Sequence, residues 1–122
     1  MLLTQWTYTR EEWNRFLQWK RGKRGLLFAW LQRLVPGREK SVPEVSIGPD
    51  RIWVNKVHEP FQDRQRQFRE IQIREAGSLN ILEIRYVQGN QIRGIELPIP
   101  KGKLKEAFDV QAKLYRDNPL VS

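Results

Sequence analysis

The sequence feature that most limits the fold is a period-2 alternation of apolar and charged side chains between residues 68 and 99. Successive side chains of a β-strand point to opposite sides, so this alternation is typical of strands that bury one face. It occurs in three consecutive runs with turn sequences between them: residues 68–75, Ala76-Gly77-Ser78, residues 82–86, Gly89-Asn90 and residues 95–99. We therefore expect an antiparallel meander with one apolar face and one charged face in solvent.

Two further runs with strand character precede the meander. Residues 45–47 and 51–57 are joined by the turn sequence Gly48-Pro49-Asp50, which predicts a hairpin. Residues 58–66 fit either a short strand or a loop.

An amphipathic helix is predicted after the meander, over residues 103–116. Its apolar residues recur at helical spacing, and the sequence Asp117-Asn118-Pro119 is expected to end it. The apolar faces of helix and sheet suggest which residues meet: Leu104, Phe108 and Tyr115 on the helix, and Ile71, Ile84 and Leu97 on the sheet. The fold class is therefore expected to be α+β.

The N-terminal part of the chain predicts a short alternating strand that ends at Tyr8, followed by a helix. Thr9 and Glu12 have the spacing of a capping box, so we expect the helix to begin at Arg10. Tyr8 and Trp13 have the spacing of a hydrophobic staple across this helix start.

The apolar face of this helix is interrupted by a basic segment, Arg21-Gly22-Lys23-Arg24-Gly25. Glycine destabilises a helix interior by about 1 kcal/mol, so two helices joined by a basic elbow fit the pattern, the second ending at Pro36-Gly37. The face itself comprises Trp13, Phe16, Leu17, Lys20, Arg24, Leu27, Leu31 and Leu34. Leu27, Leu31 and Leu34 would either pack against the sheet or form the seam of a homodimer.

Most of the net charge of +8 lies in the same region. Residues 10–40 contain nine lysines and arginines against three glutamates, whereas the rest of the chain contains thirteen basic residues against eleven acidic ones. A solvated helix face accounts for this excess as readily as a contact surface does.

If the excess marks a contact surface, its candidate residues are the basic and tryptophan side chains around the elbow: Trp19, Lys20, Arg21, Lys23, Arg24 and Trp30. Tryptophan beside lysine or arginine is typical of segments that bind the anionic face of a membrane. A protein partner would use the same surface. Alternatively, Trp19 and Trp30 belong to the core between helix and sheet. The pI near 10.2 also admits nucleic acid as the partner, but no nucleic-acid-binding motif accompanies it.

The sequence shows no recognisable catalytic centre, and we expect a non-enzymatic protein without metal or other cofactors. The absence of cysteine excludes thiol nucleophiles and cysteine-bound metals. The single histidine, His58, has no serine, cysteine or second histidine near it in the sequence. His58, Glu59 and Asp63 are too scattered to predict a metal site. Four glutamates of the meander alternate with arginines and predict cross-strand ion pairs on exposed faces: Glu70, Glu75, Glu83 and Glu96.

No membrane-spanning segment is predicted. The N-terminus lacks the pattern of a signal peptide. The most apolar stretch, residues 26–35, would span about 15 Å as a helix, about half of a bilayer's hydrocarbon core. We expect a cytoplasmic protein, either free or peripherally bound to a membrane.

The order of these elements is similar to that of a known family. Val45-Ser46-Ile47-Gly48-Pro49-Asp50-Arg51-Ile52 opens a hairpin, and Leu97-Pro98-Ile99-Pro100-Lys101-Gly102-Lys103 leads into the last helix. This pattern resembles bacterial pleckstrin-homology-like (PH-like) domains, most closely the soluble domain of YcxB-like proteins, over residues 44–116 and more loosely over residues 4–17. Those proteins usually carry a hydrophobic membrane hairpin before the domain, whereas residues 26–35 are too short and too charged for one.

The resemblance implies a PH-like antiparallel β-roll or barrel closed by the C-terminal amphipathic helix, with an extra N-terminal helical segment. We expect a single domain over residues 1–122, with the basic helical segment in residues 1–37 and the PH-like part in residues 44–116. PH-like domains bind phosphoinositides, peptides or proteins. The basic phosphoinositide signature of the eukaryotic members is missing from residues 48–51. The resemblance therefore implies a binding or scaffolding protein, without assigning ligand residues.

Overall fold

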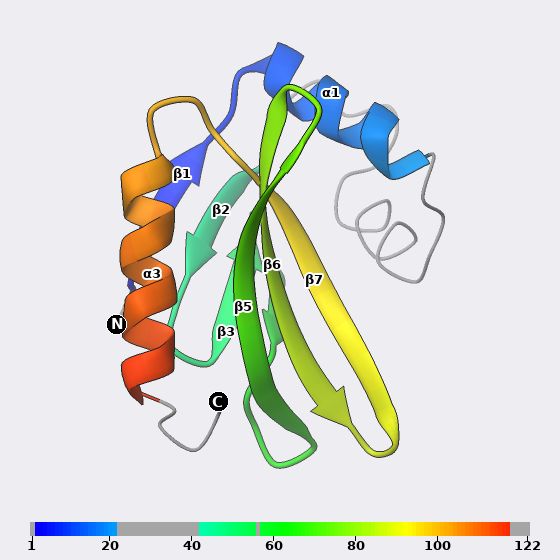
Figure 1. Ribbon diagram of the computed structural model, residues 1–122, viewed down its shortest axis with the longest axis vertical. Coiled ribbons are helices and arrows are strands. Elements are labelled where there is room, and N and C mark those ends of the chain that lie inside the picture. Colours follow the sequence, from blue (N-terminus) through cyan, green and yellow to red (C-terminus); the bar gives the residue numbers. More distant parts are fainter. Residues whose placement is uncertain (1, 22–41, 56, 118–122) are drawn as a thin grey trace.

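The computed structural model describes residues 2–21, 42–55 and 57–117. The elements within these ranges, shown in Figure 1, are β1 (Thr4–Thr7), α1 (Arg10–Arg21), β2 (Glu44–Ile47), β3 (Arg51–Val54), β4 (Val57–Pro60), β5 (Arg66–Ala76), β6 (Leu79–Gln88), β7 (Gln91–Ile99) and α3 (Leu104–Asp117). The strands form two antiparallel sheets, ordered β1-β2-β3-β4 and β5-β6-β7. The predicted α+β class is confirmed.

The two sheets are separate. Among the described strands, no ladder joins one sheet to the other, so these residues do not form the closed barrel that the resemblance implied. Helix α3 lies along one side of the molecule, beside β1 and β5, and α1 lies across one end of the three-stranded sheet (Figure 1). No helix in the described ranges is long and apolar enough to span a bilayer.

Helix α1 begins at the residue that the capping box predicts. The amide of Glu12 donates a hydrogen bond to Thr9 Oγ1 (3.1 Å), and the amide of Thr9 donates one to Glu12 Oε1 (2.8 Å). The rings of Tyr8 and Trp13 pack with their centroids 5.4 Å apart, which confirms the hydrophobic staple. These contacts orient α1 so that Trp13 and Phe16 are buried in the core.

The four-stranded sheet contains a reversal that the sequence pattern did not predict. The prediction of one strand over residues 51–57 is wrong, because the chain turns at Asn55 and forms β3 and β4. Asn55 has a φ of 54°, in the left-handed region that asparagine enters more readily than most residues. Its side-chain oxygen accepts a hydrogen bond from the amide of Glu44 (3.1 Å), and its own amide donates one to the Glu44 carbonyl (2.8 Å). The turn is thus fixed to the start of β2.

The three-stranded sheet is the predicted meander, with longer strands than the alternation indicated. Two rows of apolar residues cross it: Ile71–Ile84–Ile95 and Ile73–Leu82–Leu97. Gly77 and Gly89, with φ of 63° and 60°, lie at its two tight turns, where a positive φ disfavours other residues. The meander and both of its turns are confirmed.

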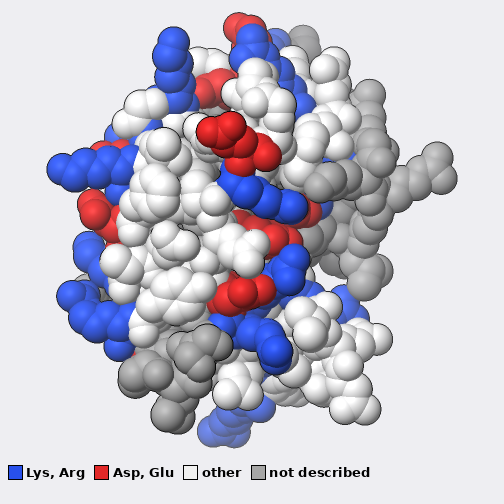
Figure 2. All heavy atoms as spheres, viewed as in Figure 1, with Lys and Arg blue, Asp and Glu red and all other residues white. Residues whose placement is uncertain are grey.

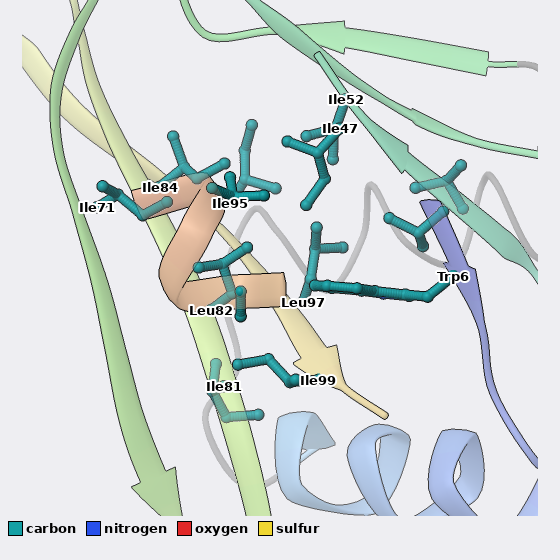
Figure 3. Packing of buried hydrophobic residues seen from close by; sticks show 14 of the residues in the cluster. Trp6, Ile47, Ile52, Ile71, Ile81, Leu82, Ile84, Ile95, Leu97 and Ile99 are labelled. Carbon is teal, nitrogen blue, oxygen red and sulfur yellow. The ribbon is translucent and has the colours of Figure 1, made fainter. Parts of the chain in front are cut away.

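The two sheets face each other across the hydrophobic core. Figure 3 shows apolar side chains from both sheets meeting there: Trp6, Ile47 and Ile52 from the four-stranded sheet, and Ile71, Ile84, Ile95 and Leu97 from the three-stranded sheet. All of these side chains are buried, so the apolar face of each sheet is removed from water by the other sheet.

Helix α3 contacts the core only partly through the predicted face. Tyr115 of that face packs against the core and hydrogen-bonds to Ile71, as predicted. The residues of α3 that are buried are Ala107, Val110 and Leu114. Leu104 and Phe108 remain 38% and 49% exposed, so the prediction that they cover the sheet is wrong. The reason is that the four-stranded sheet already covers the apolar face of the meander, and α3 is left to pack along the edge of β5 and beside β1.

Candidate functional site

The last turn of α1 carries three of the six candidate contact residues: Trp19, Lys20 and Arg21. This turn lies at the end of the three-stranded sheet, where α1 contacts β6 and β7. The candidates Lys23, Arg24 and Trp30 lie outside the described residues, as do Leu27, Leu31 and Leu34 of the predicted dimer seam. The structure therefore describes the side-chain surroundings of two candidates, Trp19 and Lys20.

Lys20 is buried, with 5% of its surface exposed. Its ammonium group donates a hydrogen bond to Glu96 of β7, which is 6% exposed, and the two groups form an ion pair. Removing a charge from water costs several kcal/mol, so a buried lysine requires such a partner. Lys20 therefore joins α1 to the sheet, and its charge does not face solvent.

Glu96 belongs to a chain of charged side chains on the outer face of the three-stranded sheet. Arg74 of β5 pairs with Glu96, and its Nη2 lies 3.9 Å from Glu83 Oε1. Arg85 of β6 continues the chain, with Nε 3.5 Å from Glu83 Oε1 and Nη1 3.2 Å from Glu70 Oε1. Figure 2 shows acidic and basic side chains alternating along a band over this sheet. Ion pairing is thus confirmed for three of the four meander glutamates.

The prediction that these glutamates lie on an exposed face is wrong for Glu83 and Glu96. Glu83 is only 8% exposed, and both carboxylates lie at the end of the sheet that α1 covers. Gly94 of β7 leaves room for the Glu83 side chain, because a Cβ at this position would lie 3.3 Å from Glu83 Oε2. Glu83 and Glu96 are therefore shielded from solvent, whereas Arg74, Arg85 and Glu70 of the same face remain partly exposed.

The pKa of Glu96 is set by opposing effects. Burial alone would raise the pKa, but the hydrogen bonds and positive charges of Lys20 and Arg74 outweigh burial and lower it below the ordinary value of 4.5. Glu96 is therefore ionised at neutral pH. Glu83 Oε1 and Arg74 Nε are buried and have no hydrogen-bond partner within the described ranges. Attraction between charges, more than hydrogen bonding, therefore holds this part of the cluster together.

Trp19 lies over the same cluster and is half-buried against the core. Its ring centroid is 6.0 Å from that of Phe16, 5.7 Å from Lys20 Nζ and 6.0 Å from Arg74 Cζ. Trp19 therefore packs between the helix and the sheet, in agreement with the alternative that placed it in the core. The sequence signal was the helical spacing of Trp13, Phe16 and Lys20 on one face, which already placed Lys20 on the core side of α1.

The histidine region contains no comparable cluster. His58 is exposed on β4, and its Nδ1 lies 3.4 Å from Arg51 Nη1. Glu59 pairs with Arg66, and Asp63 accepts hydrogen bonds from the amides of Gln65 and Arg66 (2.8 Å each). The described residues contain no group of three histidine, aspartate or glutamate side chains arranged to hold a metal ion.

The chain matches no protein-family model, and no curated protein or solved structure matches it at a significant level.

Proposed function

We propose that this chain is a non-enzymatic binding or scaffolding protein of PH-like architecture, whose basic, aromatic N-terminal segment contacts the anionic face of a membrane. The residues assigned to this contact are Arg21, Lys23, Arg24 and Trp30. Trp19 is omitted because its ring packs against Phe16 and lies beside Lys20 and Arg74. Lys20 is omitted because its charge is paired in the interior. A protein partner at the same segment is the competing assignment, and nucleic acid is the alternative.

The PH-like part of the proposal is supported by the order of the elements. A four-stranded antiparallel sheet is followed along the chain by a three-stranded antiparallel meander, and a single C-terminal helix follows both. The helix packs at an edge where the two sheets approach each other, beside β1 and β5. This order agrees with the resemblance drawn from residues 44–116.

The contact assignment is supported chiefly by the way α1 is anchored. Trp13 and Phe16 are buried in the core, and the Lys20–Glu96 ion pair joins the last turn of α1 to β7. The chain therefore leaves α1 at a defined point on the protein, immediately before Lys23 and Arg24. Cationic and tryptophan side chains next to such a point suit an anionic lipid surface.

A membrane surface suits these features better than nucleic acid does. Sheet-based recognition of single-stranded RNA uses aromatic side chains exposed on strands for base stacking. In the described meander, Phe68 and Tyr86 are both buried. Arg66 also covers the Tyr86 ring, with its Cζ 5.1 Å from the ring centroid. These rings are therefore occupied within the protein.

Co-sedimentation with vesicles tests the proposal. The chain is expected to bind vesicles that contain phosphatidylglycerol and to bind weakly to pure phosphatidylcholine. The double variant Lys23→Gln/Arg24→Gln should lose about 25-fold in partitioning, since each basic residue near an anionic surface contributes about fivefold. The matched control is Arg64→Gln/Arg69→Gln, which removes two exposed charges away from α1.

Two results would reject the membrane assignment. One is equal binding, or no binding, to neutral and anionic vesicles. The other is an equal loss for the control variant, which would mean that only net charge matters. A steep salt dependence of binding to single-stranded RNA, weakened by Lys23→Gln/Arg24→Gln but without vesicle binding, would instead select nucleic acid.

A further inference from the structure

The connection between β7 and α3 presents a compact group of basic side chains. Residues 101–105 are all exposed and include Lys101, Lys103 and Lys105. The turn is well defined, because Gly102 has a φ of 86° and the amide of Lys103 donates a hydrogen bond to Pro100 O (3.0 Å). Within the described ranges, no ion pair joins these three lysines to an acidic side chain. Their charges are therefore directed to solvent.

Two large apolar side chains project from the helix that follows these lysines. Leu104 and Phe108 lie one turn apart on the same side of α3 and remain 38% and 49% exposed. Lys105 and the exposed Ala112 lie on the same side of the helix. In Figure 2, uncharged side chains cover the surface over α3 and β5, and basic side chains project at its margin. The start of α3 thus combines exposed apolar groups with cations.

Acidic groups near this surface neutralise little of its charge. The carboxylate of Glu12 is held by the amides of Thr9 (2.8 Å) and Lys101 (2.7 Å), and is therefore directed to the backbone. Two acidic residues lie in the first two turns of α3. Glu106 is partly buried, and Asp109 is exposed. Among the exposed side chains of residues 101–109 there are three lysines and one carboxylate, so cations predominate where this surface meets solvent.

This combination suits the headgroup region of an anionic membrane. Apolar side chains that project from a helix enter the boundary between headgroups and acyl chains, while lysines beside them contact lipid phosphates. Single-stranded nucleic acid is less suited, because Phe108 is the one aromatic side chain of this surface, whereas proteins that bind single strands stack successive bases on several rings. The hydrogen bond from Lys101 to Glu12 also places this surface next to the start of α1, at the end of the molecule where α1 lies (Figure 1).

We infer that Lys101, Lys103, Leu104, Lys105 and Phe108 form a second docking surface for an anionic lipid membrane. The inference deepens the proposed function, since this surface and the N-terminal segment would contact one membrane together. Two separate basic elements that bind one membrane would restrict the orientation of the protein on the bilayer more than one element does.

Vesicle binding by the full chain tests the two kinds of contact separately. The variant Lys101→Gln/Lys105→Gln should partition about 25-fold less onto vesicles of phosphatidylcholine mixed with phosphatidylglycerol, at about fivefold for each lysine. The variant Leu104→Gln/Phe108→Gln should partition about tenfold less, because it removes apolar area from the bilayer. Both sites are exposed, so circular dichroism should show unchanged folding and thermal stability.

Matched controls remove charge or apolar surface elsewhere on the protein. Arg64→Gln/Arg69→Gln removes two exposed charges, and Val57→Thr/Ile92→Thr reduces two exposed apolar side chains on strands. Both controls should partition as the unchanged protein does. Equal losses in controls and test variants would overturn the inference, because binding would then follow total charge and apolarity.

The outcomes separate this inference from the proposed function. If Lys23→Gln/Arg24→Gln weakens binding and the α3 variants do not, the N-terminal contact stands and the α3 surface is rejected. If the α3 variants weaken binding and Lys23→Gln/Arg24→Gln does not, the α3 surface stands and the N-terminal assignment is rejected. A chain that binds neutral and anionic vesicles equally overturns both. An α3 variant that weakens RNA binding without weakening vesicle binding overturns the α3 surface.

Discussion

The ammonium group of Lys20 on α1 is paired with the carboxylate of Glu96 on β7 in the interior, although 76 positions separate the two residues in the chain. This pair joins the N-terminal helix to the far end of the meander. It also has further neighbours, since Arg74 pairs with Glu96 and lies near Glu83. Lys20, Glu96 and Arg74 together therefore connect α1, β7 and β5 through their charges.

Removal of Lys20 is expected to destabilise the protein strongly. Lys20→Met would leave Glu96 buried with Arg74 as its remaining cation, and should lower the free energy of unfolding by about 3 kcal/mol. The double variant Lys20→Met/Glu96→Leu removes both charges. Its loss of unfolding free energy should therefore be smaller than the sum of the losses for Lys20→Met and Glu96→Leu. Urea denaturation of the four proteins measures this coupling. If the losses of the two single variants add up to that of the double variant, Lys20 and Glu96 do not stabilise each other.

Stability should fall in acid because of Glu96. The folded pKa of Glu96 lies below its ordinary value of 4.5, so ionised Glu96 stabilises the fold above that value, and the contribution is lost as the pH falls through the folded pKa. Glu96→Gln should be less stable than the unchanged protein at neutral pH and should lose less on acidification. Urea midpoints across the acid range test this prediction. Parallel pH profiles for the two proteins would assign the acid sensitivity to other carboxylates, such as Glu12 and Asp63, whose pKa values are also lowered.

Tyr115 should stabilise the edge of β5 through its hydroxyl group. This group accepts a hydrogen bond from the amide of Ile71 (3.1 Å) and lies 3.0 Å from the Ile71 carbonyl. Tyr115→Phe should lower the free energy of unfolding by about 1–2 kcal/mol, because the amide of Ile71 loses its partner. Gln111→Leu is the control, since it removes a donor to the same carbonyl (3.0 Å) but leaves the amide bonded. Calorimetry should show the larger loss for Tyr115→Phe, and the reverse order would contradict the assignment.

The capping box should contribute beyond α1 itself. Thr9→Ala should cost about 1 kcal/mol, the usual value for an N-cap. Glu12→Ala should cost more, because Glu12 also accepts a hydrogen bond from the amide of Lys101 (2.7 Å) and so connects α1 to the β7–α3 turn. Glu12→Gln keeps an acceptor oxygen and should recover part of the loss. Chemical denaturation ranks the three variants, and equal costs for Thr9→Ala and Glu12→Ala would show that the contact with Lys101 contributes nothing.

Local patterns in the sequence were sufficient for most of the elements. The capping box located the start of α1, and the alternation of the meander located β5, β6 and β7, because both patterns act between residues close in the chain. The strand break at Asn55 was not predicted, because only Asn55 and Lys56 separate the apolar residues 52–54 from Val57. Asn55 adopts the left-handed conformation together with its hydrogen bonds to Glu44. Glu44 lies eleven positions away, so a local sequence pattern does not report this contact.

The sequence by itself determined the α+β class, the meander and the capped helix, whereas the tertiary structure decided which faces of these elements are buried. Periodicity identifies a face but not the surface it meets. The four-stranded sheet covers the meander, so α3 packs by Ala107, Val110 and Leu114 and leaves Leu104 and Phe108 exposed. α1 packs across β6 and β7 and brings Lys20 to Glu96, so Lys20 becomes an internal cation. Burial depends on contacts between residues distant in the chain, and such contacts exist only after the elements have packed.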